Sequence, residues 1–171
     1  MKKLISFSLL FAVLFATLSC SAQEDKSKRP SPPAKLTATI NDAKIVIDYS
    51  QPSVKGRTIG KEIAPYGEVW RTGANEATTF EVSRDVKIEG RELKAGKYAL
   101  FTIPAENQWT IIFNKEPNQW GAFKYDQSKD ALRVPVKPTK AKSFTERMTF
   151  VQNGNKIALL WGDTEVDFMV Q

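Results

Sequence analysis

Two apolar runs decide the fold of this chain: YALFTI at residues 98–103 and WTIIF at residues 109–113. Both are rich in aromatic and β-branched side chains, which favour extended strands. Neither run alternates between apolar and polar side chains, and strands of this kind are covered on both faces. The sequence therefore predicts that these two strands form the middle of the domain.

Shorter runs with a period of two lie outward from this centre. Leu36, Ala38 and Ile40 share one face, Asn41-Asp42 turns the chain, and the next strand, 45–49, alternates in the same way. This pattern predicts a hairpin. Further runs are expected at residues 78–82, 86–88, 132–136, 144–151, 156–161 and 165–170. Turns are expected at residues 153–155 and 162–163, which contain glycine and polar residues.

About ten strands and no long amphipathic helix define the expected fold class. It is all-β: a single antiparallel β-sandwich or jelly-roll-like domain at residues 34–171, with a closed barrel as the alternative. Only 58–64 and 126–132 leave room for a helical turn. The first is interrupted by Gly60, and the second begins with an aspartate that can cap a helix.

The N-terminus predicts export. MKK is a positive start, and Leu4–Leu18 is an apolar run too short for a stable membrane span, so residues 1–22 form a signal peptide. Residues 17–20, TLSC, approximate a lipoprotein box in which Thr17 replaces the usual aliphatic residue. Cleavage after Ala22 is the rival, and it would give a soluble protein. Cys20 is the chain's one cysteine, and a lone thiol in an oxidising envelope favours lipidation.

Residues 23–33, QEDKSKRPSPP, contain no apolar side chain to bury and are stiffened by proline. They are expected to be a polar Pro-rich linker between the signal peptide and the domain. With Cys20 lipidated, this tether would hold the domain off the membrane. The expected location is the periplasm, or the envelope membrane through the lipid anchor alone.

The composition excludes several classes of function. The formal charge is +6, and removal of residues 1–22 takes away Lys2 and Lys3 and leaves +4. These charges are interspersed, so nucleic-acid binding is not expected. The chain has no histidine, which excludes Ser-His-Asp and Cys-His catalysis and zinc sites that need histidine. No cofactor or metal is expected, and an enzyme would have to use carboxylates, Lys, Tyr, Ser or Thr.

Residues 70–76, WRTGANE, admit two interpretations. As a corner, Gly73 takes a positive φ angle, Asn75 bonds its own backbone, and Arg71 pairs with Glu76 across the bend. As a binding site, Arg71 offers five donors to an anion, while Trp70 and its polar neighbours suit sugars or peptides.

A second cluster of similar composition is NKEPNQWG at residues 114–121, directly after a central strand. Loops at one end of a sandwich are where binding residues gather, so both clusters are expected at one rim. The candidate ligand-binding residues are Trp70, Arg71, Thr72, Asn75, Glu76, Asn114, Lys115 and Trp120.

Four successive segments carry a family resemblance: YSQPSVKGRTIG, APYGEVWRTGANEATTFEVSRDVKIEG, LKAGKYALFTIP and WTIIFNKEPNQWGAFKYD. Together they resemble the bacterial envelope family catalogued as domain of unknown function twenty-nine eleven, from about Pro30 to the C-terminus. The resemblance implies a signal-bearing, β-rich envelope protein, often lipoprotein-like. It implies no particular activity and transfers no site residue.

Three functions are compatible with these observations. The first, which we favour, is a non-catalytic envelope domain that binds a small polar molecule, a glycan or a peptide. The second is a histidine-free hydrolase or lyase acting through Glu76, with Glu68 or Asp126 as a second carboxylate. The third is a structural or protein-interaction module. Oligomeric state is not determined by the sequence.

The lipoprotein interpretation makes one direct prediction. Mass spectrometry of the mature protein should find a diacylated or triacylated Cys20 at the N-terminus. An N-terminus at free or cyclised Gln23 would instead establish ordinary signal-peptide cleavage and rule out the anchor.

Overall fold

The computed structural model describes residues 25–171. The expected signal peptide at residues 1–22, and with it Cys20, lies outside the described residues. The linker expected at 23–33 is described from Asp25 onward.

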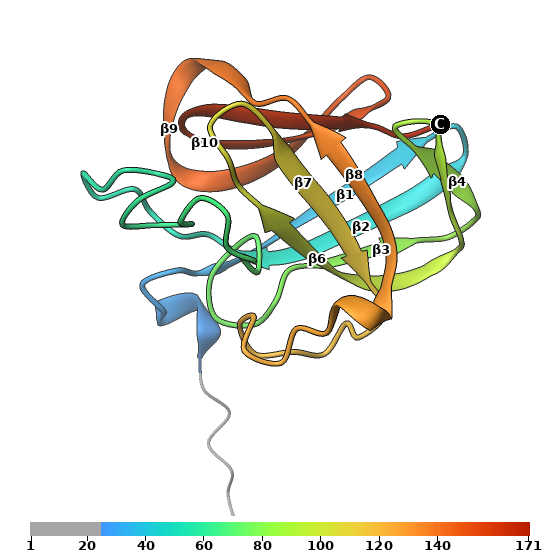
Figure 1. Ribbon diagram of the computed structural model, residues 1–171, viewed down its shortest axis with the longest axis horizontal. Helices are drawn as coiled ribbons and strands as arrows, with labels where there is room; N and C mark the ends of the chain where they lie inside the picture. Colours follow the sequence, from blue (N-terminus) through green and yellow to red (C-terminus); the bar gives the residue numbers. More distant parts are fainter. Residues whose placement is uncertain (1–24) are drawn as a thin grey trace, which may run out of the picture.

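The regular secondary structure of the described chain is almost all β, which confirms the predicted all-β fold class (Figure 1). Its strands are β1 (Pro33–Ile40), β2 (Ala43–Ser50), β3 (Thr79–Val82), β4 (Val86–Ile88), β5 (Arg91–Leu93), β6 (Gly96–Ile103), β7 (Trp109–Asn114), β8 (Asp130–Val136), β9 (Thr139–Asn153) and β10 (Lys156–Met169). Two short 3-10 turns, η1 (Lys26–Lys28) and η2 (Gln127–Lys129), accompany them.

The strands form one large antiparallel sheet and two hairpins. The large sheet has the order β1-β2-β3-β6-β7-β8, and the hairpins are β9-β10 and β4-β5. The first and last strands of the large sheet, β1 and β8, are not paired with each other, so the sheet is open rather than closed into a barrel. The long β9-β10 hairpin lies against one face of it, which gives a sandwich-like arrangement (Figure 1).

The turn residues explain the first hairpin. Asn41 and Asp42 have φ angles of 48° and 61°, and the residues that flank them, Ile40 and Ala43, are paired across the strands. Two consecutive positive φ angles are the geometry of a two-residue type I′ turn, which matches the twist of the flanking strands. The predicted hairpin is confirmed.

Strands β6 and β7 are interior strands of the large sheet, with β7 next to the edge strand β8, and both are covered on both faces, as predicted. On the inner face, Leu100 and Phe113 belong to the main core, which also contains side chains of β9 and β10. On the outer face, Phe101 and Ile112 belong to a smaller cluster. That cluster is completed by residues of two connecting segments rather than by a second sheet: Val69, Ala77, Ala122 and Tyr125.

Three local expectations are corrected. The turn expected at residues 162–163 is absent: Gly162 (φ 58°) lies at a register shift within β10 instead of reversing the chain, so the runs expected at 156–161 and 165–170 belong to one long strand. Residues 58–64 contain no helical turn; Gly60 donates to the Ile63 carbonyl in a tight loop. The short strand β5 was not expected. By contrast, Asp126 caps η2 by accepting from the Ser128 amide at 2.9 Å, as predicted.

Truncation in the main core tests this packing. Phe113 lies edge-on to Phe80 at 5.0 Å between ring centroids and also contacts Tyr98 and Phe168. Phe113→Ala should therefore lower the free energy of unfolding by about 3–5 kcal/mol in chemical denaturation. The matched change Phe144→Ala, at a side chain that is 56% exposed, should cost no more than about 0.5 kcal/mol. Equal effects of the two substitutions would contradict the assigned core.

Candidate functional site

The WRTGANE segment enters the sheet at its first residue. Trp70 and Thr102 exchange backbone hydrogen bonds of 2.8 and 2.9 Å, so the chain runs beside β6 before it loops outward. Thr72 is fully buried with φ 53°, and its hydroxyl donates to that of Thr102 at 3.2 Å. The Thr78 hydroxyl donates to the Thr72 carbonyl at 2.7 Å. Through these contacts, Thr72 holds the corner in place.

Trp70 and Trp120 are not brought together. The Trp70 ring stacks on Trp161 at 5.1 Å with an interplanar angle of 10°, and lies edge-on to Trp109 at 6.3 Å. It packs against the main core. Trp120 is instead 57% exposed. Of these two tryptophans, Trp120 is therefore the one whose indole is available at the surface.

The two sequence clusters nevertheless meet. The Ala77 amide donates to the Gln119 carbonyl at 2.9 Å, and the Gly121 amide donates to the Asn75 carbonyl at 3.0 Å. Glu76 and Trp120 therefore face each other across an antiparallel bridge. WRTGANE and NKEPNQWG are thus joined over the outer face of the large sheet.

Glu76 pairs with the N-terminal segment and not with Arg71. The Lys26 ammonium lies 2.8 Å from one Glu76 carboxylate oxygen, and the Arg29 guanidinium lies 2.9 Å from the other. Arg29 also lies over the Trp120 ring, 6.0 Å from its centroid. The sequence pattern did not reveal these contacts, because the ion pairs join residues about fifty positions apart.

The end of the expected linker is also held in place. Asn75 donates through its side chain to the Ser31 carbonyl at 3.2 Å, and the Gln51 amide donates to the Pro32 carbonyl at 2.9 Å. The described residues before β1 therefore lie against the corner that WRTGANE forms.

The Asn114 side chain connects the loop that follows β7 to the segment before β8. Its side chain is fully buried and donates to the Asp126 carbonyl at 2.9 Å and to the Asp130 carboxylate at 2.8 Å. Its side-chain oxygen accepts from the Glu116 amide and from Gln119. A side chain with its donors and acceptor so engaged has little capacity left for a ligand. Lys115, the next residue, is exposed.

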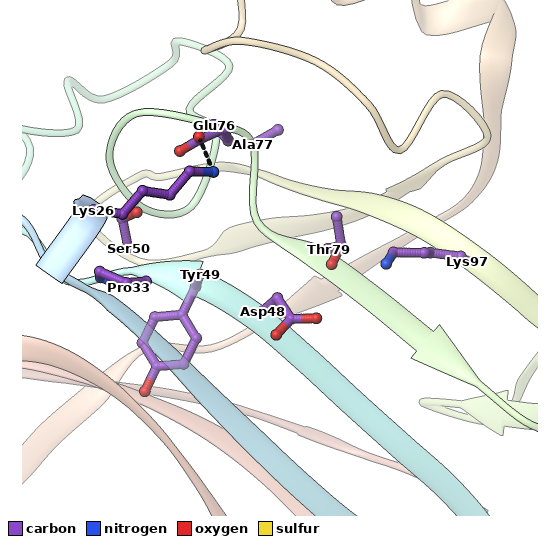
Figure 2. Close-up of a pocket in the computed structure, with 9 residues that line it drawn as sticks. All are labelled: Lys26, Pro33, Asp48, Tyr49, Ser50, Glu76, Ala77, Thr79 and Lys97. Carbon is purple, nitrogen blue, oxygen red and sulfur yellow. Dashed lines mark hydrogen bonds and ion pairs between the residues drawn. The ribbon is translucent and has the colours of Figure 1, made fainter. Parts of the chain in front are cut away.

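A cleft of about 220 Å³ opens beside Glu76, on the outer face of the sheet (Figure 2). Asp48, Thr79 and Lys97 line it from the neighbouring strands β2, β3 and β6. Figure 2 shows the Lys97 side chain extending toward Thr79 and the Lys26 ammonium reaching Glu76. The remaining lining residues are Pro33, Tyr49, Ser50 and Ala77.

The sequence analysis missed Asp48, Thr79 and Lys97. Alternation within each strand does place them on the outer face, opposite Ile47, Phe80 and Tyr98. Their convergence depends on the strand order, in which β3 pairs with β6 across a long connection. Other hollows of similar size exist, such as one of about 300 Å³ beside β4 and β5. The cleft at Glu76 is lined by one residue of WRTGANE, Glu76, which is bridged to Trp120 of the second cluster.

Electrostatics keep the Glu76 carboxylate ionised. Partial burial alone would raise its pKa, but the hydrogen bond from Lys26, a backbone hydrogen bond and the charges of Lys26 and Arg29 outweigh burial and leave the pKa below its ordinary 4.5. The pKa of Asp126 is also lowered, chiefly by the Ser128 amide. Wherever a carboxyl pKa is displaced in the described part of the chain, the displacement is downward: Asp25, Glu62, Glu76, Asp85 and Asp126.

The Arg71 guanidinium forms no hydrogen bond or ion pair with any residue in the described part of the chain. Its Nε atom is buried without a hydrogen-bond partner among residues 25–171. Three further buried polar atoms within this range lack a partner: Thr79 Oγ1, Gln119 Oε1 and Trp161 Nε1. Thr79 is the one of these residues that lines the cleft.

Within residues 25–171, no three or more Cys, His, Asp or Glu side chains are grouped so that they could hold a metal ion. None of the helical segments in this range is long and apolar enough to cross a membrane.

Comparison with known proteins identifies the family. The model of the family described as protein of unknown function (DUF2911) matches residues 31–170, so the chain belongs to that family. No curated protein and no solved structure shows a significant match to it.

The ion pairs of Glu76 predict a specific titration. Since its pKa is lowered in the folded state, the ion pairs stabilise the docked N-terminal segment above about pH 4.5 and are lost as the pH falls through the folded value. In an NMR titration of the Glu76 carboxyl carbon, Lys26→Gln should raise the pKa. The control is Lys28→Gln, two residues further along the chain, where the lysine pairs with Asp25 instead. This substitution should leave the Glu76 pKa unchanged. A Glu76 pKa that is insensitive to Lys26→Gln would contradict the assigned contact.

Proposed function

We propose that this member of the family is an exported, non-catalytic binding domain of the cell envelope. Its ligand is a small polar molecule, or one residue of a glycan or peptide, held in the cleft between Glu76, Asp48 and Lys97. The observation that carries the proposal is the cleft itself, which gathers side chains of both charges beside the joined sequence clusters.

The size of the cleft supports a small ligand. A volume of about 220 Å³ is below the range of roughly 300–1,000 Å³ that suits drug-sized ligands. One sugar ring or one amino-acid residue is the appropriate scale.

The chemistry of the lining supports a ligand with polar groups around its periphery. Asp48 and Glu76 offer acceptors, and Lys26 and Lys97 offer donors. Asp48 already pairs with Lys35 at 3.0 Å, and Lys97 lies 3.7 Å from Glu81, but all four of these side chains are well exposed. Exposed pairs of this kind contribute little, so a ligand can replace them at small cost.

The Thr79 hydroxyl also supports a polar ligand in the cleft. Its oxygen is buried in the wall of the cleft without a partner among the described residues. A buried hydroxyl without a hydrogen bond destabilises the folded state. A polar ligand, or a water that accompanies it, would supply the missing bond.

Binding is favoured over hydrolysis by the pKa of Glu76. A general acid must be protonated at the working pH, and a good general base has a pKa near that pH. The Glu76 pKa is lowered, and so is that of Asp126. Both carboxylates are thus poorly matched to the hydrolase or lyase alternative, and the ionised Glu76 is suited to holding a ligand in the cleft by hydrogen bonds.

Export is the second part of the proposal and rests on the sequence of residues 1–22. The positive start and short apolar run support passage across the inner membrane, and Cys20 supports a lipid anchor. In that arrangement the docked residues Lys26 and Arg29 would fix the domain close to its point of attachment.

The binding proposal predicts a defined mutational pattern. N-acetylglucosamine and glycylglycine are titrated separately into the purified protein, and amide shifts are followed by NMR. At least one probe should perturb the amides of Thr79 and Lys97. Asp48→Asn and Lys97→Gln should each weaken that binding by about tenfold, because each removes one charge-assisted hydrogen bond.

The control is Lys55→Gln, at an exposed lysine in the loop after β2 that lines no part of the cleft. It should leave the affinity unchanged. The proposal fails for these ligand classes if neither probe shifts the cleft amides, or if all three variants bind as the parent does.

A further inference from the structure

We infer that Arg71 is the receptor for a carboxylate group whose ligand also carries an apolar or aromatic portion, at a surface formed by Arg71, Gly121 and Phe123. This surface is separate from the cleft, because none of these three residues lines it.

The side-chain directions of the neighbouring residues indicate on which face of the sheet Arg71 lies. Trp70 packs into the main core on the inner face of the large sheet. Successive side chains of an extended segment point to opposite faces, so Arg71 lies on the outer face, as Val69 does in the outer cluster. The guanidinium is therefore held among the apolar residues that cover β6 and β7.

The guanidinium lacks the partner that such a position requires. No described residue forms a hydrogen bond or ion pair with it, and its Nε is buried without an acceptor. The guanidinium charge is partly removed from water, and this burial lowers the pKa of Arg71. A partly desolvated charge without compensation is costly, and a bound anion would remove that cost. Arg133 provides the contrast, because its guanidinium lies 2.6 Å from the Asp130 carboxylate.

Gly121 keeps the surface open. A Cβ atom at this position would lie 2.9 Å from the Phe123 ring and 3.4 Å from an Arg71 terminal nitrogen. The ring and the guanidinium therefore share the space above the glycine. Any other residue would also have to adopt the positive φ angle of 67° found here.

The aromatic surface beside the cation is accessible. The Phe123 side chain is 84% exposed, and Trp120, three positions earlier in the loop, is also exposed. An apolar group on the ligand can cover Phe123 while its anionic group reaches Arg71. The combination favours an amphiphilic acid over a purely polar anion.

The single charge of Arg71 favours a carboxylate over a phosphate. The planar guanidinium fork matches two carboxylate oxygens, and the resulting pair is neutral. A phosphate group carries about −1.5 to −2 charges at pH 7 and would bring an uncompensated charge into a partly apolar site. Free aromatic acids and the C-terminal carboxylate of a peptide share the required chemistry.

The test uses benzoate, its neutral isostere benzamide, and inorganic phosphate with the purified protein. The NMR signal of the Arg71 Nε–H group reports binding directly. Benzoate should shift this signal, and benzamide should not. Arg71→Gln should abolish benzoate binding, and Arg71→Lys should weaken it about tenfold because the fork geometry is lost.

Two further variants keep the test decisive if Arg71→Gln fails to fold. Phe123→Ala, at an exposed side chain, should weaken benzoate binding several-fold and leave acetate binding unchanged. Arg84→Gln, which removes one exposed arginine charge elsewhere, should have no effect. The inference is overturned if benzamide binds as well as benzoate, if phosphate binds more tightly, or if Phe123→Ala leaves benzoate binding unchanged.

N-acetyl-alanyl-phenylalanine, with a free C-terminal carboxylate, distinguishes the source of the ligand. Tighter binding than benzoate identifies a peptide terminus, and equal or weaker binding identifies a free acid; either ranking supports the site. The Arg71 surface and the cleft can be tested separately. Asp48→Asn and Lys97→Gln, which alter the cleft, should leave benzoate binding unchanged.

Discussion

The structure depends on one constraint: strands β6 and β7 carry apolar side chains on both faces, so both faces must be shielded from water. The β9-β10 hairpin shields the inner face. The outer face is shielded by residues of the connecting segments, including Val69, Ala77 and Tyr125. Those segments are therefore parts of the folded core and not merely connections at its edge.

The candidate sites are consequences of this cover. The segments that shield β6 and β7 also carry Glu76, Arg71 and Phe123, and the bridge between Glu76 and Trp120 fixes them relative to each other. Where the cover ends, over β2 and β3, the outer face is left as the polar cleft. Binding residues placed on loops that are anchored to a rigid sheet are positioned without a large loss of entropy on binding.

Much of the fold could be predicted from alternation and turn chemistry. The β1-β2 hairpin follows from Asn41-Asp42, and the central strands follow from their two-sided apolar runs. The continuity of β10 could not be predicted, since glycine marks both turns and bulges and only the partner strand decides between them. Less of the candidate site could be predicted from the sequence. The inward direction of Trp70 and the contacts of Lys26 and Arg29 with Glu76 depend on long-range packing, which local patterns do not encode.

The central claim is that the two connecting segments are a fixed cover of β6 and β7, and amide hydrogen exchange in the native state tests it most directly. The amides of Ala77 and Gly121 form the bonds that join the segments. The account predicts that both exchange slowly, with protection approaching that of the Thr102 amide in β6. Exchange as fast as that of the exposed Lys124 amide would show that the cover opens freely and would contradict the account.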